Sequence, residues 1–403
     1  PTTRASGPDL LSPHPWHLVH PAAMLAQVVA AATLLAGPGV AAYEAIGAYM
    51  PVNGVLEHSQ MSLDVAAFRA ALSNDVPHYA GAKAVYELSG GNSCRSPTDG
   101  RALGGFNKKN MSGEAFYEAF MAAGFAPDFW DSWMRSALDG TGDFAGALHA
   151  KRVASLKAGA MGLVTLYVTH VMEIGISKGA VPETRADNAS AFFWDMGWAF
   201  YHGASPDGAD APWGLARECD ADFPGGLQVS LAIVPHFNKG LAALRSRTYS
   251  AGLALEARET IYRMWAVTYL RSVLKALREA EGSQDAAAHA RAHASFRAID
   301  GWVHAQCAAA ADAVREKLAI TQASVPPGTF CAVKRTLESA YPAMGLNCSV
   351  VGALPDEANT PCAGCADSPA WFPAGQPAVA PVAATVTDVT CKKGPAPEAR
   401  LRR

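Results

Sequence analysis

The chain is short of charged residues, and neither sign is in clear excess. Only 17% of its 403 residues are charged, and the formal net charge is −3. A domain that binds nucleic acid usually carries a strongly basic patch, and this composition predicts none. Half of the residues are hydrophobic, which is ample material for a large core. We therefore expect a globular protein without a nucleic-acid partner.

Sequence motifs of the common enzyme classes are also missing. The chain contains no HExxH or HxxEH motif, no GxxxxGK[ST] loop and no GxGxxG that follows a strand. Residues 175–179, GISKG, have the GxSxG spacing, but they follow a helical run and not a strand, so they do not form a nucleophile elbow. These absences weaken the case for a zinc peptidase, and they remove the usual signatures of nucleotide-binding proteins and serine hydrolases. No residue stands out as an activated nucleophile. The sequence therefore favours a binding protein over an enzyme.

Alternating apolar and polar runs, which are typical of half-buried strands, are few, whereas alanine is abundant. This pattern predicts an all-α protein, a helical bundle with long loops near residues 89–110 and 205–226. Residues 43–355 are the expected helical domain, with helices over residues 158–176, 227–246, 251–281 and 284–318. The similarity of residues 64–70 to residues 292–298 fits either two related halves, 43–180 and 181–355, or chance matching in an alanine-rich chain.

Both ends of the chain differ from this domain. A short apolar run after residue 22 ends in Gly-Pro and the small residues 40–42, which is the pattern of a secretory signal peptide. An uncleaved anchor is the alternative, but the run is shorter than the ~20 residues that a bilayer requires. We expect cleavage near Ala42 and a mature protein that does not span the membrane. Residues 356–403 are rich in Pro and Ala, and this tail is predicted to be extended or disordered.

The cysteines agree with export. There are eight, scattered along the chain, and we expect most of those between residues 94 and 365 to form disulfides in an oxidising compartment. Only Cys362 and Cys365 are close in sequence, so a zinc site, which needs two such pairs, is not expected. The sequons at Asn110, Asn188 and Asn347 fit a secreted glycoprotein, although such triplets also arise by chance.

The most informative stretch for function is residues 157–203. Its first part is apolar on every side, as in a buried helix, yet it holds His170 and Glu173 on one helical face. The next helix carries Asp195 and His202 among aromatic residues. Burial of an imidazole beside a carboxylate is costly unless each has a partner or a metal ion. The stretch therefore predicts either a metal site or a set of hydrogen-bonded core residues.

Other polar residues are weaker candidates. Glu218, Asp220 and Asp222 lie in the second long loop and are expected to be solvated. Glu256 and Glu259 lie one turn apart, but Arg258 and Arg263 nearby favour salt bridges at least as strongly as metal ligation. His289 and His293 have a spacing that can hold a metal ion, whereas Arg291 between them favours a solvated helix face.

Several stretches, taken in order, resemble a known family. They are VLEHSQMSLD near residues 55–64, YELSGGNS with GRALGGF, SALDGTGDF, THVMEIGISK, FFWDMGWAFYHG, and FRAIDGWV with YPAMGLN. The chain is similar over residues 43–352 to the low-iron-inducible periplasmic proteins, the secreted iron-assimilation proteins of algae. The resemblance implies a secreted, helical, non-catalytic protein that captures iron outside the plasma membrane and assists a plasma-membrane iron uptake system.

The resemblance also suggests metal ligands, by position. Glu57 and His58, with Asp64 nearby, fall in one motif, His170 and Glu173 in another, and Asp195 in the WD block. Oxygen and imidazole ligands suit Fe³⁺ or Fe²⁺. Met196 stands where an acidic residue often follows in the family, which removes one potential ligand. Alternatives are an imelysin-like metal-dependent hydrolase, which the HxxE pair also resembles, and a cell-wall interaction protein without a ligand.

Overall fold

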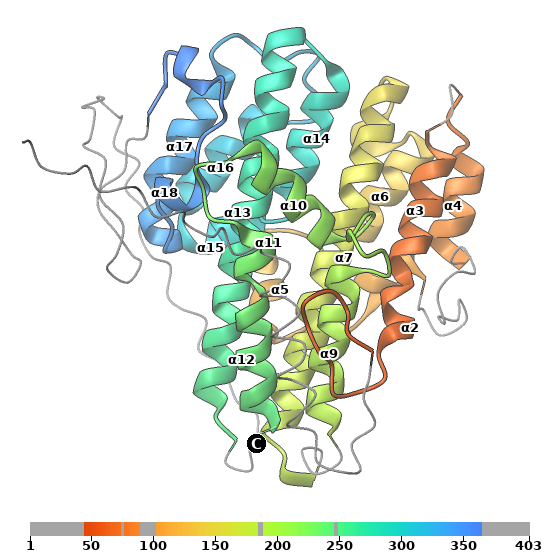
Figure 1. The fold of residues 1–403 in the computed structure, drawn as a ribbon. Coiled ribbons are helices and arrows are strands. Elements are labelled where there is room, and N and C mark those ends of the chain that lie inside the picture. Colours follow the sequence, from red (N-terminus) through yellow and green to blue (C-terminus); the bar gives the residue numbers. More distant parts are fainter. Residues whose placement is uncertain (1–43, 74–75, 89–101, 184–187, 246–248, 365–403) are drawn as a thin grey trace, which may run out of the picture. The chain divides into compact units, whose positions relative to one another are not determined.

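The structure is a computed structural model that describes residues 44–73, 76–88, 102–183, 188–245 and 249–364. Within these ranges every regular element is a helix, apart from one isolated bridge between Ile46 and Tyr49. The expected all-α fold is therefore confirmed. In chain order the α-helices are α2 (Leu56–Ser59), α3 (Met61–Ala71), α4 (Tyr79–Leu88), α5 (Ala115–Ala122), α6 (Phe129–Asp139), α7 (His149–Gly179), α9 (Ala189–His202), α10 (Pro212–Asp222), α11 (Val229–Ala232), α12 (Val234–Arg245), α13 (Ala251–Ser283), α14 (Ala286–Arg297), α15 (Asp300–Gln306), α16 (Ala308–Lys317), α17 (Thr329–Met344) and α18 (Cys348–Val351) (Figure 1).

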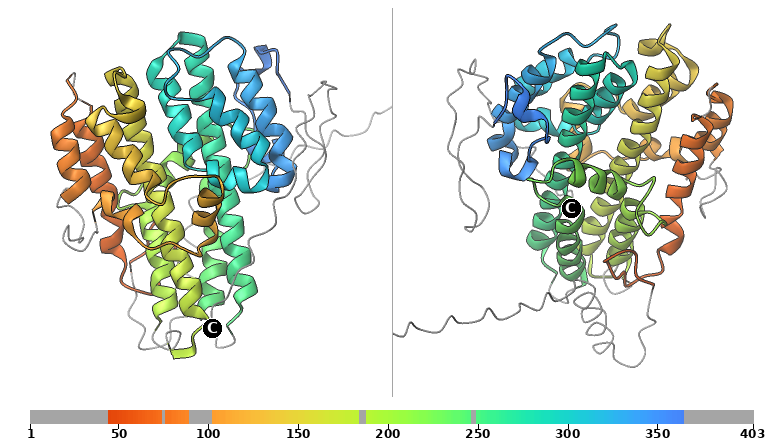
Figure 2. Two further views of the ribbon diagram at one scale, coloured as in Figure 1. Left: turned by 180° about the vertical axis from the view of Figure 1, so that it is seen from behind. Right: turned by 45° about the horizontal axis from the view of Figure 1, so that its top comes forward.

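Helix α7 is central to the fold, and it is contacted by α3, α5, α6, α9, α10, α12, α13 and α14. Every residue from Gly159 to Met172 is buried, as expected for a helix that is apolar on all sides. Helices α9 and α14 lie against α7, and α13 packs on α12 and α14 (Figure 2). A Cβ atom at Gly175 would lie 3.0 Å from the Ser190 carbonyl oxygen on α9, so glycine permits the two backbones to approach closely. Since α9 and α14 cover α7, the candidate halves 43–180 and 181–355 share one packed core.

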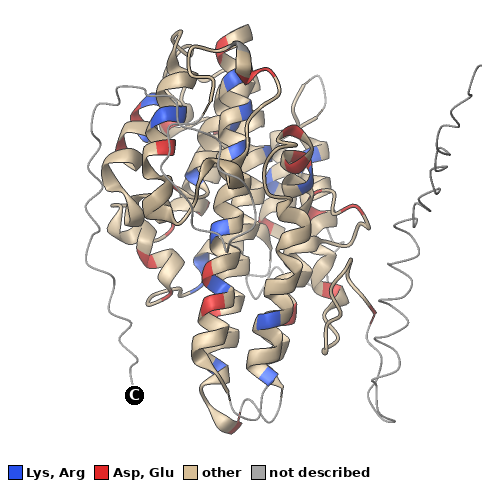
Figure 3. Cartoon of the chain, turned by 60° about the vertical axis from the view of Figure 1, so that its left-hand side comes forward, with Lys and Arg blue, Asp and Glu red and all other residues tan. Residues whose placement is uncertain are grey.

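The same helix is the one described helix with the length and hydropathy of a membrane span. Of its most apolar window, 89% is buried inside the protein. The core helix of a globular protein has these properties too, so this finding is weak evidence for a span. Figure 3 shows Lys and Arg interleaved with Asp and Glu over the helices.

Two parts of the predicted helix pattern are wrong. The single helix expected over residues 284–318 is three helices, α14, α15 and α16. Helix α15 ends at Gln306, because the backbone of the next residue, Cys307 (φ −154°, ψ 86°), is incompatible with a helix. Cys307 is disulfide-bonded. The second long loop contains helix α10, which starts at Pro212. Proline is well suited to a first helical position because its fixed φ is already helical and its missing N–H is not needed there.

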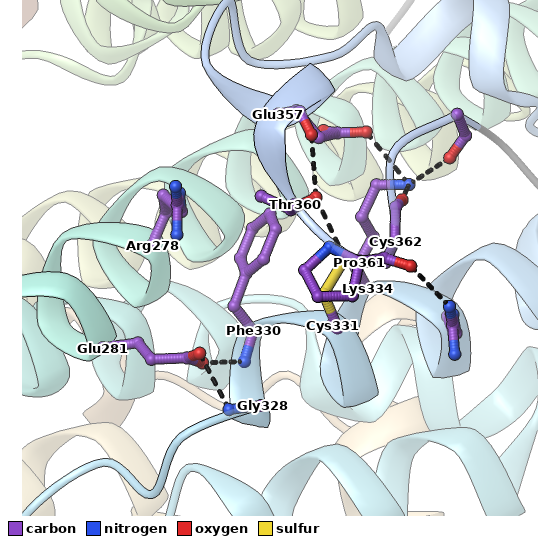
Figure 4. Close-up of a disulfide and its surroundings, with 12 residues drawn as sticks. Arg278, Glu281, Gly328, Phe330, Cys331, Lys334, Glu357, Thr360, Pro361 and Cys362 are labelled. Carbon is purple, nitrogen blue, oxygen red and sulfur yellow. Dashed lines mark hydrogen bonds and ion pairs between the residues drawn. A yellow bond between two sulfur atoms is a disulfide. The ribbon is translucent and has the colours of Figure 1, made fainter.

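The packed part of the chain extends to Gly364, beyond the predicted boundary at residue 355. A short 3₁₀ helix, η4 (Glu357–Asn359), is followed by Cys362, which forms a disulfide with Cys331 on α17 (Figure 4). We call residues 356–364 the clasp segment. Its composition suggested an extended tail, but the covalent bond and the ionic contacts described next hold it on α17.

Lys334 lies under the clasp segment and is 4% exposed. Its ammonium group forms ion pairs with Glu338 on the same helix and, at 3.1 Å, with Glu357. It also donates to the carbonyl oxygens of Cys362 (3.2 Å) and Gly364 (2.7 Å). Burial of a charge is costly unless it is paired and hydrogen-bonded, and here four oxygen atoms satisfy one ammonium group.

The cysteine prediction is confirmed where it can be followed. Cys331 and Cys362 are bonded to each other, and Cys307 and Cys348 each take part in a disulfide. Cys219 is a buried free thiol. Cys94, Cys365 and Cys391 lie outside the described residues, as do the signal-peptide segment 1–42 and the remainder of the predicted tail.

Candidate functional site

His170 on α7 pairs with Glu114, the residue that precedes α5. The His170 Nδ1 atom lies 2.6 Å from Glu114 Oε1, and the imidazole is largely buried. Burial raises the pKa of Glu114, the hydrogen bond and charge of His170 lower it, and the nearby charge of Glu173 raises it. The second carboxylate oxygen of Glu114, Oε2, is buried and has no hydrogen-bond partner within the described ranges. Such an orphaned oxygen is a position where water or a metal ion would be expected.

Glu173, one turn further along α7, is held by α13. Arg258 Nη1 donates to both carboxylate oxygens at 2.8 and 3.0 Å, and the Tyr262 hydroxyl donates to Oε1 at 3.1 Å. Burial raises the pKa of Glu173, while Arg258 and Tyr262 oppose that effect. Arg258 also pairs with Glu259 at 2.6 Å, which confirms the salt-bridge interpretation for Glu259. Glu256 instead pairs with Lys239.

Asp195 belongs to a different set of contacts. It is fully buried and accepts hydrogen bonds from the Tyr49 hydroxyl (2.6 Å), the Val52 amide (2.9 Å) and the Asn53 side chain (2.9 Å). These donors fix residues 49–53 against α9. Burial raises the Asp195 pKa, and the hydrogen bonds lower it. The carboxylate is thus already satisfied by protein donors, and its contacts are those of a structural residue.

The remaining predicted ligands also have separate environments. Glu57 is exposed at the start of α2. The ring of His58 packs at 5.9 Å from Phe192 and 5.5 Å from Phe200, measured between centroids. His202 Nδ1 lies 3.1 Å from the Gly203 carbonyl. Among the described residues, no group of three or more His, Cys, Asp or Glu side chains is arranged to hold a metal ion.

The structure therefore places the predicted metal ligands in separate environments and adds one residue, Glu114, to the pair on α7. His170 and Glu173 share a face as predicted, and Glu114 joins them from the position just before α5, whereas Asp195 does not. We call Glu114, His170 and Glu173 the α7 cluster. Sequence reasoning missed Glu114 because its partner lies 56 residues away. A carboxylate at the start of a helix is usually a solvated helix-start residue, so nothing local marked it.

Two expectations of solvated side chains are wrong. Asp220 is 4% exposed. It caps α11 through the Val229 and Ser230 amides and pairs at 2.7 Å with Arg271. His289 is 1% exposed, because α14 turns this face toward α7, while Arg291 points to Glu279 on α13.

A family model described as low iron-inducible periplasmic protein matches residues 23–370. No curated protein and no solved structure matches the chain.

Proposed function

Because the chain belongs to the low iron-inducible periplasmic protein family, we propose that it binds an iron ion and assists iron assimilation without catalysing a reaction. The protein is periplasmic, as the family is. Iron would be its cargo, taken up as Fe³⁺ or Fe²⁺ outside the plasma membrane. Delivery to a plasma-membrane iron uptake system is part of the same proposal.

The observation that carries the proposal is the α7 cluster. It offers two carboxylates and an imidazole, which are ligand types that iron accepts. Glu114 Oε2 is buried without a described partner, so one ligand atom is available without the loss of any hydrogen bond. The cluster is also partly desolvated, which strengthens the attraction between carboxylates and a cation.

Binding requires two local changes. The hydrogen bond between Glu114 and His170 must open, so that the imidazole nitrogen or the carboxylate can face the ion. Glu173 must turn from Arg258, or share its second oxygen. Both changes free polar groups that the ion then satisfies. Since ligation needs a neutral imidazole and ionised carboxylates, iron affinity should fall as the pH drops below neutral.

The proposal is tested by metal analysis of the purified full chain after exposure to an equal mixture of Fe, Zn, Cu and Mn. We expect iron to be retained, and Glu114→Gln or Glu173→Gln to reduce bound iron at least tenfold. Glu256→Gln is the matched control, since Glu256 is a carboxylate on α13 that is exposed and outside the cluster. Helical content by circular dichroism should be unchanged in all three variants.

Full iron occupancy in the double variant Glu114→Gln with His170→Gln would contradict the assignment to the α7 cluster. Absence of iron from the wild-type chain under every condition would contradict iron binding itself.

A further inference from the structure

The three glycosylation sequons lie in different local structures. The first, residues 110–112, lies in the turn between the 3₁₀ helix η2 (Leu103–Lys108) and α5, and none of its three residues is helical. In the second and third sequons the hydroxyl residue belongs to a helix, Ser190 to α9 and Ser349 to α18. A sequon that carries a glycan is expected in a surface loop, and the first sequon has this position.

The first sequon presents its acceptor to solvent. Asn110 and Ser112 are exposed, whereas Met111 between them is 1% exposed and anchors the turn in the core. One apolar side chain thus fixes the turn, and the two polar side chains that a glycosyl transferase recognises lie outside. A glycan is bulky and belongs on the surface, and this turn can carry one without displacing a packed side chain.

Hydrogen bonds hold the turn without using the acceptor nitrogen. The side-chain oxygen of Asn110, Oδ1, accepts from the Ser112 amide at 3.1 Å, which is the contact of an Asx turn. The Met111 carbonyl accepts from the Glu114 amide at 3.0 Å. Glycosylation replaces one hydrogen on Asn110 Nδ2 and leaves Oδ1 able to accept. The glycan can therefore be attached while the turn keeps both contacts.

The other two sequons are built into packed helix starts. The Asn347 Oδ1 atom caps α18 by accepting from the Val350 amide at 3.0 Å, and Cys348 in the middle of that sequon is disulfide-bonded. In the second sequon Ser190 is 1% exposed, and its hydroxyl donates to the Leu244 carbonyl on α12 at 3.4 Å. Once these contacts form, neither sequon is an accessible, non-helical segment.

Two lysines directly precede the exposed asparagine. Lys108, the last residue of η2, has a side chain that is 54% exposed, and its Nζ atom lies 3.6 Å from Asp131 Oδ2. Lys109 follows, so a lysine-specific protease would cleave the bond between Lys109 and Asn110. A cut there would release one end of the turn that carries Glu114. A glycan on the residue just after this bond hinders access to it by its bulk.

We propose that Asn110 carries an N-linked glycan that shields the bond between Lys109 and Asn110, and that Asn188 and Asn347 are unmodified. A periplasmic protein of a eukaryotic cell meets the transferase in the secretory pathway. In the transfer, Asn110 Nδ2 forms a bond to C1 of the sugar and loses one proton. The bond between C1 and the diphosphate of a lipid-linked oligosaccharide donor breaks, and the lipid diphosphate leaves. The proposal does not depend on iron binding.

The test uses the full chain secreted from a eukaryotic cell. We expect peptide mass spectrometry to find an oligosaccharide on Asn110 and none on Asn188 or Asn347. Ser112→Ala destroys the sequon but keeps the Asn110 side chain and the backbone amide that it contacts, so this variant should lose the glycan. Ser112→Thr is the matched control, because it preserves the sequon and should keep the glycan. An unmodified Asn110 in the wild type, or a glycan on Asn188 or Asn347, would overturn the assignment.

Shielding is measured on the folded proteins with a lysine-specific protease. Cleavage after Lys109 should be at least tenfold slower in the glycosylated wild type and in Ser112→Thr than in Ser112→Ala. The wild type treated with a glycosidase after folding gives the same comparison without a substitution, and it stands if Ser112→Ala impairs folding. Equal cleavage after Lys109 before and after removal of the glycan would overturn the shielding role.

Discussion

At the scale of single residues, burial decides what the histidines of this protein can do. His289 and His293 have pKa values of about 4 and about 3, lowered first by burial and then by neighbouring cations. In the unfolded chain the same groups titrate near 6.5. At a pH between the folded and the unfolded pKa, the unfolded state binds protons at these histidines and the native state does not. Acid therefore favours unfolding.

We therefore predict that the metal-free protein loses stability as the pH falls from 6.5 to 4. For His289 the pKa difference corresponds to about 3 kcal/mol of unfolding free energy. Urea unfolding at several pH values measures the loss, and His289→Gln should flatten the curve by that amount. The exposed His149→Gln is the control. An equal slope in wild type and His289→Gln would contradict the prediction.

Sequence alone predicted the spacing of these two histidines but not their burial. Arg291 between them is a side chain that normally marks a solvated face, and only contact with α7 shows that α14 is turned the other way. The α7 cluster has the same limit. His170 and Glu173 were visible as a helical pair, whereas Glu114 and Arg258 come from 56 and 85 residues away. Partners at such distances are fixed by packing, which no local pattern contains.

At the scale of elements, long apolar helices were predictable and short ones were not. Helices α7 and α13 are long enough for their amino-acid composition to indicate helical structure without tertiary contacts. The breaks between α14, α15 and α16 depend on tertiary contacts. A Cβ atom at Gly301 in α15 would lie 2.5 Å from the Phe120 ring, so this short helix is positioned by close contact with α5. Such contacts override the helix propensity of an alanine-rich run.

The contact between α7 and α9 gives a prediction at this scale. Gly175→Ala would place a Cβ atom 3.0 Å from the Ser190 carbonyl and 3.3 Å from the Trp194 amide, and backbone atoms cannot move aside as a flexible side chain can. We expect a loss of about 1–3 kcal/mol. Gly282→Ala, near the end of α13, meets no atom within 4 Å and should gain about 0.5–1 kcal/mol. Chemical denaturation of both variants compares them, and equal effects would refute the explanation.

At the scale of the whole molecule, covalent links add to the packing of one helical core. The disulfide between Cys331 and Cys362 spans 31 residues. By loop-closure entropy a link of this length contributes about 3–4 kcal/mol. The double change Cys331→Ser with Cys362→Ser should lower the unfolding free energy by that order.

Alkylation of the cysteine thiols tests the same disulfide without a substitution. Alkylation of the folded wild-type protein without reductant should leave Cys219 unlabelled, because its thiol is buried and its pKa is raised to about 12. Rapid labelling of Cys331 or Cys362 would show that the link is not formed in the secreted protein. In the double variant Cys331→Ser with Cys362→Ser, Cys219 should be alkylated no faster than in the wild type if the loss of stability is confined to the clasp segment.

The clasp segment has a mechanical consequence. Gly364, the last described residue, accepts a hydrogen bond from Lys334, and Cys362 just before it is covalently fixed to α17. Tension that reaches Gly364 therefore passes through the sulfur–sulfur bond between Cys362 and Cys331 into α17, and does not peel the residues between these two cysteines from the bundle turn by turn. Residues 332–361, which lie between the two cysteines, are thereby shielded from a pull on Gly364.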